Sequence, residues 1–252
     1  MLILDQVVKA FGGDRAVDGV SCTLQAGRIT GLIGPNGAGK TTLFNLIAGA
    51  HRPTSGRITL EAQDITGRGA DRIFRAGLAR TFQIPRPFPA MSVLENVMLA
   101  PRGQAGEAFW RNWFTPGAVG RQEREVRERA LHWLDFVGLA KLASEPARVL
   151  SGGQRKLLEL ARVMVANPRL VLLDEPGAGV NPALLDTIVD RIAVLHKQGT
   201  SFLVIEHNMD MVASLCDPVL VMAQGKLLVQ GTPAEVLADA RVREAYLGTA
   251  EA

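Results

Sequence analysis

The chain has 252 residues, of which 47% are hydrophobic and 21% charged, an ordinary composition for a globular protein. No apolar run approaches the roughly 18 residues that cross a bilayer, and the N-terminus lacks the features of a secretory signal. The net charge is +3 with scattered arginines, which is too little to argue for a nucleic-acid partner. Cys22 and Cys216 lie far apart among apolar residues, and we predict two buried free thiols in a reducing compartment.

The N-terminal part of the chain alternates strand and turn signals before a helix. Strands are expected at 2–8, 20–25, 29–33 and 57–60. The third strand runs directly into a glycine-rich segment, and from Lys40 the apolar period becomes helical.

The middle of the chain is expected to be helical, and the C-terminal part to alternate strands and helices. Strand signals vanish between about 91 and 166, and an amphipathic helix at 121–137 ends at Gly138. The elements expected after it are strands at 170–173, 201–205, 219–222 and 227–230 and helices at 184–197 and 209–215. This order predicts an α/β core split by a helical subdomain.

The glycine-rich segment Gly34–Thr41 fits the pattern G-x-x-x-x-G-K-[ST]. Glycines allow backbone N–H groups to point at phosphate oxygens, and the helix that follows adds the positive end of its dipole. Lys40 would reach the β- and γ-phosphates of ATP, and the Thr41 hydroxyl would bind Mg²⁺. A chance match in a chain of this length is on the order of one in a hundred. The residues expected to bind ATP here are Gly34, Pro35, Asn36, Gly37, Ala38, Gly39, Lys40, Thr41 and Thr42.

Two carboxylates, Asp174 and Glu175, follow four apolar residues. A buried parallel strand delivers its last residues to the sheet edge where ligands bind. Asp174 is then placed to hold Mg²⁺, and Glu175 to polarise an attacking water. A strand that ends in solvated acids is the alternative, which the upstream phosphate loop disfavours.

The segment Leu150–Gln154 (L-S-G-G-Q) begins a helix, and by itself it could be only a capped helix. Between a phosphate loop and the Asp174–Glu175 pair, it makes the sequence resemble the nucleotide-binding subunits of ABC transporters over essentially its whole length. The resemblance implies a single ABC ATPase domain, residues 1–252. It would comprise a P-loop NTPase core with an N-terminal antiparallel β part (1–90 and 167–252) and an inserted helical signature subdomain (91–166).

The resemblance also assigns roles that the separate motifs do not. To the catalytic residues Glu175 and Lys40, which the motifs already indicate, it adds His207, which would contact the γ-phosphate. Phe11 would stack on adenine, Val17 would pack beside it, and Gln83 would link Mg²⁺ and water to the membrane partner. The residues expected to bind the partner subunit's ATP are Ser151, Gly152, Gly153 and Gln154. Asn181 departs from the usual aspartate, so communication between the two sites could differ in detail.

The variable parts resemble the longer ATPase type of branched-chain amino-acid importers. The features are Arg80–Gln83, Met91–Asn96, Ile205–Met209 and the ending Arg243–Gly248. An insert at 103–120 carries Trp110, Trp113 and Phe114, which would either pack on the helical subdomain or contact a membrane subunit. The alternatives are a lipopolysaccharide-type exporter, disfavoured by the insert and by Arg80–Gln83, and a soluble non-transport ABC ATPase.

The expected partners are a second ABC ATPase subunit, identical or related, and transmembrane permease subunits. A periplasmic binding protein would take part indirectly, and nucleic acid is not expected. The expected location is cytoplasmic, peripheral on the inner face of the cell membrane.

Overall fold

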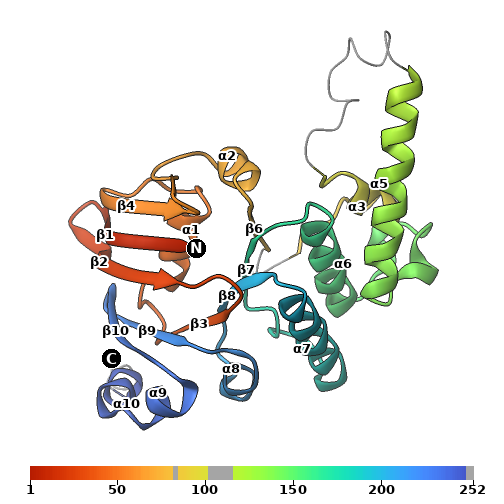
Figure 1. Cartoon of the computed structure of the whole chain (residues 1–252). Coiled ribbons are helices and arrows are strands. Elements are labelled where there is room, and N and C mark those ends of the chain that lie inside the picture. The colour runs from red at the N-terminus through yellow and green to blue at the C-terminus, as the bar shows by residue number, and fades with distance from the viewer. Residues whose placement is uncertain (82–84, 102–115, 248–252) are drawn as a thin grey trace. The chain divides into compact units, whose positions relative to one another are not determined.

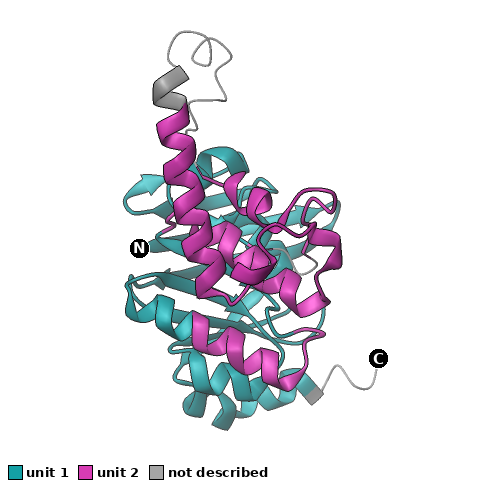
Figure 2. Cartoon of the chain, turned by 90° about the vertical axis from the view of Figure 1, so that its right-hand side faces the viewer, with its two compact units in different colours: residues 1–80, 169–177, 192–252 teal, residues 81–168, 178–191 magenta. Residues whose placement is uncertain are grey.

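The computed structural model describes residues 1–81, 85–101 and 116–247. Their contacts divide into two compact units, shown in teal and magenta in Figure 2. The core unit comprises residues 1–80, 169–177 and 192–252, and the helical unit comprises 81–168 and 178–191.

Within the described residues, the strands of the core unit form two sheets (Figure 1). The first is antiparallel with order β2-β1-β4-β5, and the second is mainly parallel with order β10-β9-β3-β8-β7-β6. The first sheet contains β1 (Leu2–Phe11), β2 (Asp14–Leu24), β4 (Ser55–Leu60) and β5 (Gln63–Asp64). The second contains β3 (Ile29–Ile33), β6 (Leu78–Arg80), β7 (Leu170–Asp174), β8 (Ser201–Ile205), β9 (Val219–Ala223) and β10 (Lys226–Gly231).

The two sheets differ in the burial pattern of their strands, as their sequences suggest. Every residue of β3, β7 and β8 is buried, as expected for parallel strands covered on both faces. In β1, buried Leu2, Leu4 and Val7 are separated by exposed residues. One apolar cluster joins these side chains to Phe44 and Ile47 of α1 (Lys40–Ile47) and to Leu203 of β8. The expected α/β class with an antiparallel β part is therefore confirmed.

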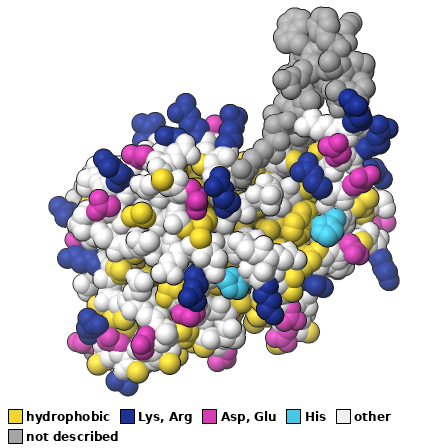
Figure 3. Space-filling model, in the orientation of Figure 1, with side chains coloured by type: hydrophobic (Ala, Val, Ile, Leu, Met, Phe, Trp, Pro, Cys, Tyr) yellow, Lys and Arg dark blue, Asp and Glu magenta, His cyan; other side chains and the backbone are white. Residues whose placement is uncertain are grey.

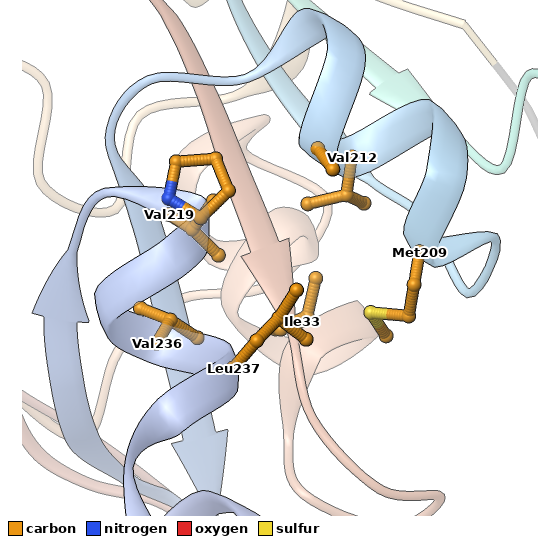
Figure 4. A pocket seen from close by; sticks show the side chains of 8 residues that line it. Ile33, Met209, Val212, Val219, Val236 and Leu237 are labelled. Atoms are coloured by element: carbon orange, nitrogen blue, oxygen red, sulfur yellow. The ribbon is translucent and has the colours of Figure 1, made fainter.

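The remaining helices of the core unit lie around these sheets. They are α2 (Ala70–Arg75), α8 (Met209–Leu215), α9 (Pro233–Ala238) and α10 (Ala240–Leu247), together with the C-terminal end of α7 (Pro182–Lys197), whose first part belongs to the helical unit. Side chains of α8 and α9 meet Ile33 of β3 around a small apolar recess (Figure 4). The Thr232–Glu235 capping box that begins α9 was a readable helix signal that sequence reasoning missed.

The helical unit packs three helices against one another: α3 (Val93–Met98), α5 (Pro116–Phe136) and α6 (Gly152–Met164). Short 3₁₀ turns lie at Ala140–Leu142 and Ala147–Val149. The face of α5 predicted from its period is buried at Val126, Ala130 and Leu134. No helix in the described part of the chain is both long and apolar enough to span a membrane.

Some element bounds differ from those expected. β2 begins at Asp14 rather than near 20, because the Gly12–Gly13 turn leads directly into strand pairing between Phe11 and Asp14. β6 was not expected; three residues are too short a run for a periodic signal. The cysteines are free, as predicted, with Cys216 buried and Cys22 partly buried.

Candidate functional site

The loop between β3 and α1 has a backbone that only glycine accommodates at two positions. Gly34 has φ +149°, and a Cβ there would lie 2.1 Å from the Met222 carbonyl oxygen. Gly39 has φ +97°, and a Cβ there would lie 2.2 Å from the Ala16 carbonyl oxygen. The first and last glycines of the motif are therefore required by close backbone approach.

Lys40 curls back over this loop. Its Nζ donates hydrogen bonds to the carbonyl oxygens of Gly34 (2.7 Å) and Pro35 (2.9 Å), and the residue is buried. Burial lowers the pKa of the Lys40 ammonium, and the negative charge of Glu175 partly offsets this. Phosphate oxygens would offer the same ammonium stronger, charged acceptors.

A cavity of about 230 Å³ opens beside the loop. Its walls bring together parts of the core unit that are far apart in sequence. The residues that line it are Ala16, Asn36, Gly37, Ala38, Gly39, Lys40, Thr41, Thr42, Glu175 and His207. Glu175 and His207 thus line the same cavity as the glycine-rich loop.

Phe11 and Val17, the two residues expected beside the adenine, differ in their exposure to solvent. Phe11 is 48% exposed at the end of β1, with the Lys9 ammonium 4.9 Å from its ring centroid and His51 at its edge. Val17 is fully buried in the apolar cluster. Ala16, rather than Val17, lies on the cavity wall.

Asp174 ends β7 in a buried ion pair. Arg80 Nη2 lies 2.8 Å from Asp174 Oδ2, and the two side chains are only 13% and 7% exposed. Arg80 Nη1 donates to Asn45 Oδ1 at 2.6 Å, so the guanidinium ties the end of β7 to α1. Sequence reasoning gave Arg80 no such role, because only the β6–β7 register, Arg80 opposite Leu172, places it beside Asp174.

Glu175 and His207 contact each other directly. His207 Nε2 lies 3.0 Å from Glu175 Oε1, which is hydrogen-bonding distance. Glu175 has φ +49°, an uncommon conformation for a residue with a side chain. Its N–H donates to the Ile205 carbonyl oxygen at 3.0 Å, which holds the turn after β7 against the end of β8.

The signature segment begins α6 in the helical unit. Ser151 is its N-cap: the side chain accepts from the Gln154 N–H, and the Gln154 side chain accepts from the Ser151 N–H. Both interactions of a capping box are present. Ser151 and Gly152 are exposed, whereas Gly153 is buried with the Leu184 side chain where its Cβ would project.

Two expected features fall outside the described residues: Gln83, and the aromatic residues Trp110, Trp113 and Phe114 of the insert. Among the described residues, no group of three or more His, Cys, Asp or Glu side chains could hold a metal ion. Thr41 lines the cavity, whereas Asp174 is not among its lining residues and pairs with Arg80. Both side chains carry hard oxygen donors of the kind that Mg²⁺ prefers.

A buried, mainly parallel sheet, a glycine-bounded loop before α1 and a carboxylate beside the resulting cavity are the features of a P-loop NTPase core. The family model "ABC transporter" matches residues 17–178, and the model "Branched-chain amino acid ATP-binding cassette transporter" matches residues 226–252. The chain belongs to the ABC transporter family, as an ATP-binding subunit with the ATPase fold of that family.

The sequence is similar to those of known transport proteins over nearly its full length. The probable branched-chain amino acid transport ATP-binding protein LivG of Archaeoglobus fulgidus is 42% identical, covering 95% of this chain and 92% of the relative. The high-affinity branched-chain amino acid transport ATP-binding protein BraF of Pseudomonas aeruginosa is 41% identical, covering 95% and 94%. A crystal structure of a nucleotide-free ATP-binding cassette from an ABC transporter superposes with a TM-score of 0.85 at 36% identity, covering 97% and 98%.

Proposed function

We propose that this chain hydrolyses ATP in a paired assembly to drive uptake of branched-chain or related amino acids. The observation that carries the substrate class is the match of residues 226–252 to the branched-chain cassette model, together with the names of the full-length relatives. These matches favour amino-acid import over export of lipopolysaccharide.

In this proposal the cavity beside the phosphate loop holds the triphosphate. Lys40 exchanges its two loop carbonyls for phosphate oxygens, and the α1 dipole adds positive potential. Mg²⁺, held by Thr41 and Asp174 with Gln83, would neutralise charge on the phosphates. The ring of Phe11, which is about half exposed, would stack on the adenine.

Glu175 is proposed to orient the attacking water, since its carboxylate lines the cavity. His207 Nε2 contacts Glu175 Oε1 and His207 also lines the cavity, so an N–H of the imidazole could donate to a γ-phosphate oxygen. In this proposal His207 would report the presence of the γ-phosphate to Glu175.

The exposed Ser151 and Gly152 at the start of α6 are proposed to contact the ATP of a second cassette, identical or related. The pair would dock on transmembrane permease subunits at the cytoplasmic face of the membrane, with a binding protein delivering the amino acid outside. Opening and closing of the pair would then follow ATP hydrolysis and binding.

Reconstitution tests the function. With its permease subunits in proteoliposomes, the chain should show ATPase activity that rises when a binding protein loaded with leucine is added. Stimulation by a lipid-linked polysaccharide instead would refute the substrate class.

Two variants test the site. Glu175→Gln should bind ATP, accumulate as a dimer and lose most turnover, whereas Lys40→Ala should weaken ATP binding itself. Wild-type turnover in the first, or unchanged ATP affinity in the second, would contradict the assignments.

A further inference from the structure

Glu206 is a buried carboxylate that the roles above leave unused. It follows β8 immediately, and only 4% of the residue is exposed. Burying a carboxylate is costly unless hydrogen bonds compensate for the lost water. Its surroundings should therefore show what compensates for that cost.

Three backbone N–H groups from two separate loops donate to this carboxylate. Gly177 N–H donates to Oε1 at 2.7 Å. His207 N–H and Asn208 N–H donate to Oε2 at 3.0 and 3.3 Å. The Glu206 side chain therefore links the loop after β7 to the loop after β8 by hydrogen bonds, with a different carboxylate oxygen for each loop; we call this link the clip.

The thiol of Cys216 lies near enough to Glu206 for the carboxylate to affect its pKa. Burial raises the pKa of Cys216 to about 12, and the negative charge of Glu206 contributes to that rise. The compensation for burial is geometric: the two Glu206 oxygens accept three backbone hydrogen bonds between them.

The clipped positions lie next to the catalytic groups. Gly177 is two residues beyond Glu175, and it is also the last residue of its segment in the core unit before the chain enters the helical unit. His207 is clipped through its own N–H. The 3.0 Å contact between Glu175 and His207 is thus made by two loops that share one anchor.

We propose that Glu206 is a positioning residue for hydrolysis: it fixes the turns that carry Glu175 and His207 relative to each other, and anchors the chain where it leaves the core unit. The proposal rests on the proposed function, because the loss it foresees is a loss of ATP turnover. Glu206 does not line the ATP cavity, so it acts through the two loops.

The structure dictates which substitutions are informative. Glu206→Gln preserves size but offers only one accepting oxygen, and its NH₂ would face N–H donors of one loop. Glu206→Ala removes the clip altogether. Asp210→Asn is the matched control, because Asp210 is an exposed acid in the first turn of the neighbouring helix α8.

We expect Glu206→Gln to lower kcat by at least about tenfold, since an ångström-scale misplacement of catalytic groups costs about a hundredfold. The KM for ATP should stay within about threefold, because a loss of transition-state contacts alone leaves substrate binding intact. Asp210→Asn should match the wild type in both constants.

Amide hydrogen exchange gives a readout that does not depend on turnover. The peptides covering 174–180 and 206–212 should exchange faster in Glu206→Gln and Glu206→Ala, while the peptide covering 34–42 stays as protected as in the wild type. Unchanged exchange in the first two peptides, or faster exchange with wild-type kcat, would overturn the proposal. Loss of protection in all three peptides would also overturn it, because the residue would then be a general stability element.

The catalytic role of Glu175 and the positioning role of Glu206 can be tested independently. If Glu175→Gln keeps wild-type turnover, the proposed catalytic assignment is wrong, while the exchange data still report whether Glu206 clips the loops. If Glu175→Gln is inactive and Glu206→Gln is fully active, only the positioning role is wrong.

Discussion

Replacing Arg80 by Met should destabilise the core unit strongly, because it leaves the Asp174 carboxylate buried without this guanidinium. The pair is 2.8 Å long with side chains 13% and 7% exposed, so solvent screens it little. The same change also removes the hydrogen bond to Asn45.

The expected magnitude follows from that burial. Removing one partner of a buried pair costs about 3–5 kcal/mol. For a chain of this size each kcal/mol lowers the melting temperature by about 2–4 °C, which gives a fall of about 6–20 °C. Replacing both partners, as in Arg80→Met with Asp174→Asn, should recover part of the loss, because no full charge then stays buried.

The chain provides a matched control in Arg57→Met. Arg57 pairs with Asp64 at 3.7 Å, but these side chains are 69% and 55% exposed. An exposed pair is worth about 0–1 kcal/mol, so this variant should melt within about 4 °C of the wild type.

The assay is thermal unfolding followed by circular dichroism in EDTA, without nucleotide. Equal melting of Arg80→Met and Arg57→Met would refute the reasoning. A double variant that loses the sum of both single losses would refute the coupling between Arg80 and Asp174.

Three further outcomes are expected. Gly39→Ala should lower ATP affinity at least about tenfold, because its Cβ would clash with the Ala16 carbonyl oxygen. Gly37→Ala has φ +78° and no atom within 4 Å of the added Cβ, so it should cost only about 1–2 kcal/mol of backbone strain. Equal ATP affinities of the two variants, measured by calorimetry, would contradict this. Ser151→Ala should cost about 1 kcal/mol in thermal unfolding through loss of the α6 cap, and an unchanged melting temperature would argue against the capping box. Burial raises the pKa of Cys22 to about 11 and that of Cys216 to about 12, so both thiols stay protonated at pH 8 and should react with a thiol reagent only after unfolding; fast labelling of the native chain would contradict this.

The sequence by itself determined those features whose residues are close together in the chain. The phosphate loop, its lysine and the helix after it are contiguous, so glycine placement and helical period were enough to locate them. The capping box at Ser151 likewise involves only four consecutive residues, Ser151–Gln154. The resemblance to ABC transporters added His207, which no local pattern distinguishes from any other helix-start histidine.

Only the tertiary structure decided which distant residues meet. The parallel register of β7 and β8 sets Asp174 opposite Ile205, so the residues that follow both strands emerge side by side. That register brings Glu175 to His207 and lets Glu206 clip both loops. In the same way, the register of β6 and β7 puts Arg80 beside Asp174. A strand pattern shows which residues are buried, but it does not fix which strands are neighbours or in what register, because those depend on packing across the whole sheet.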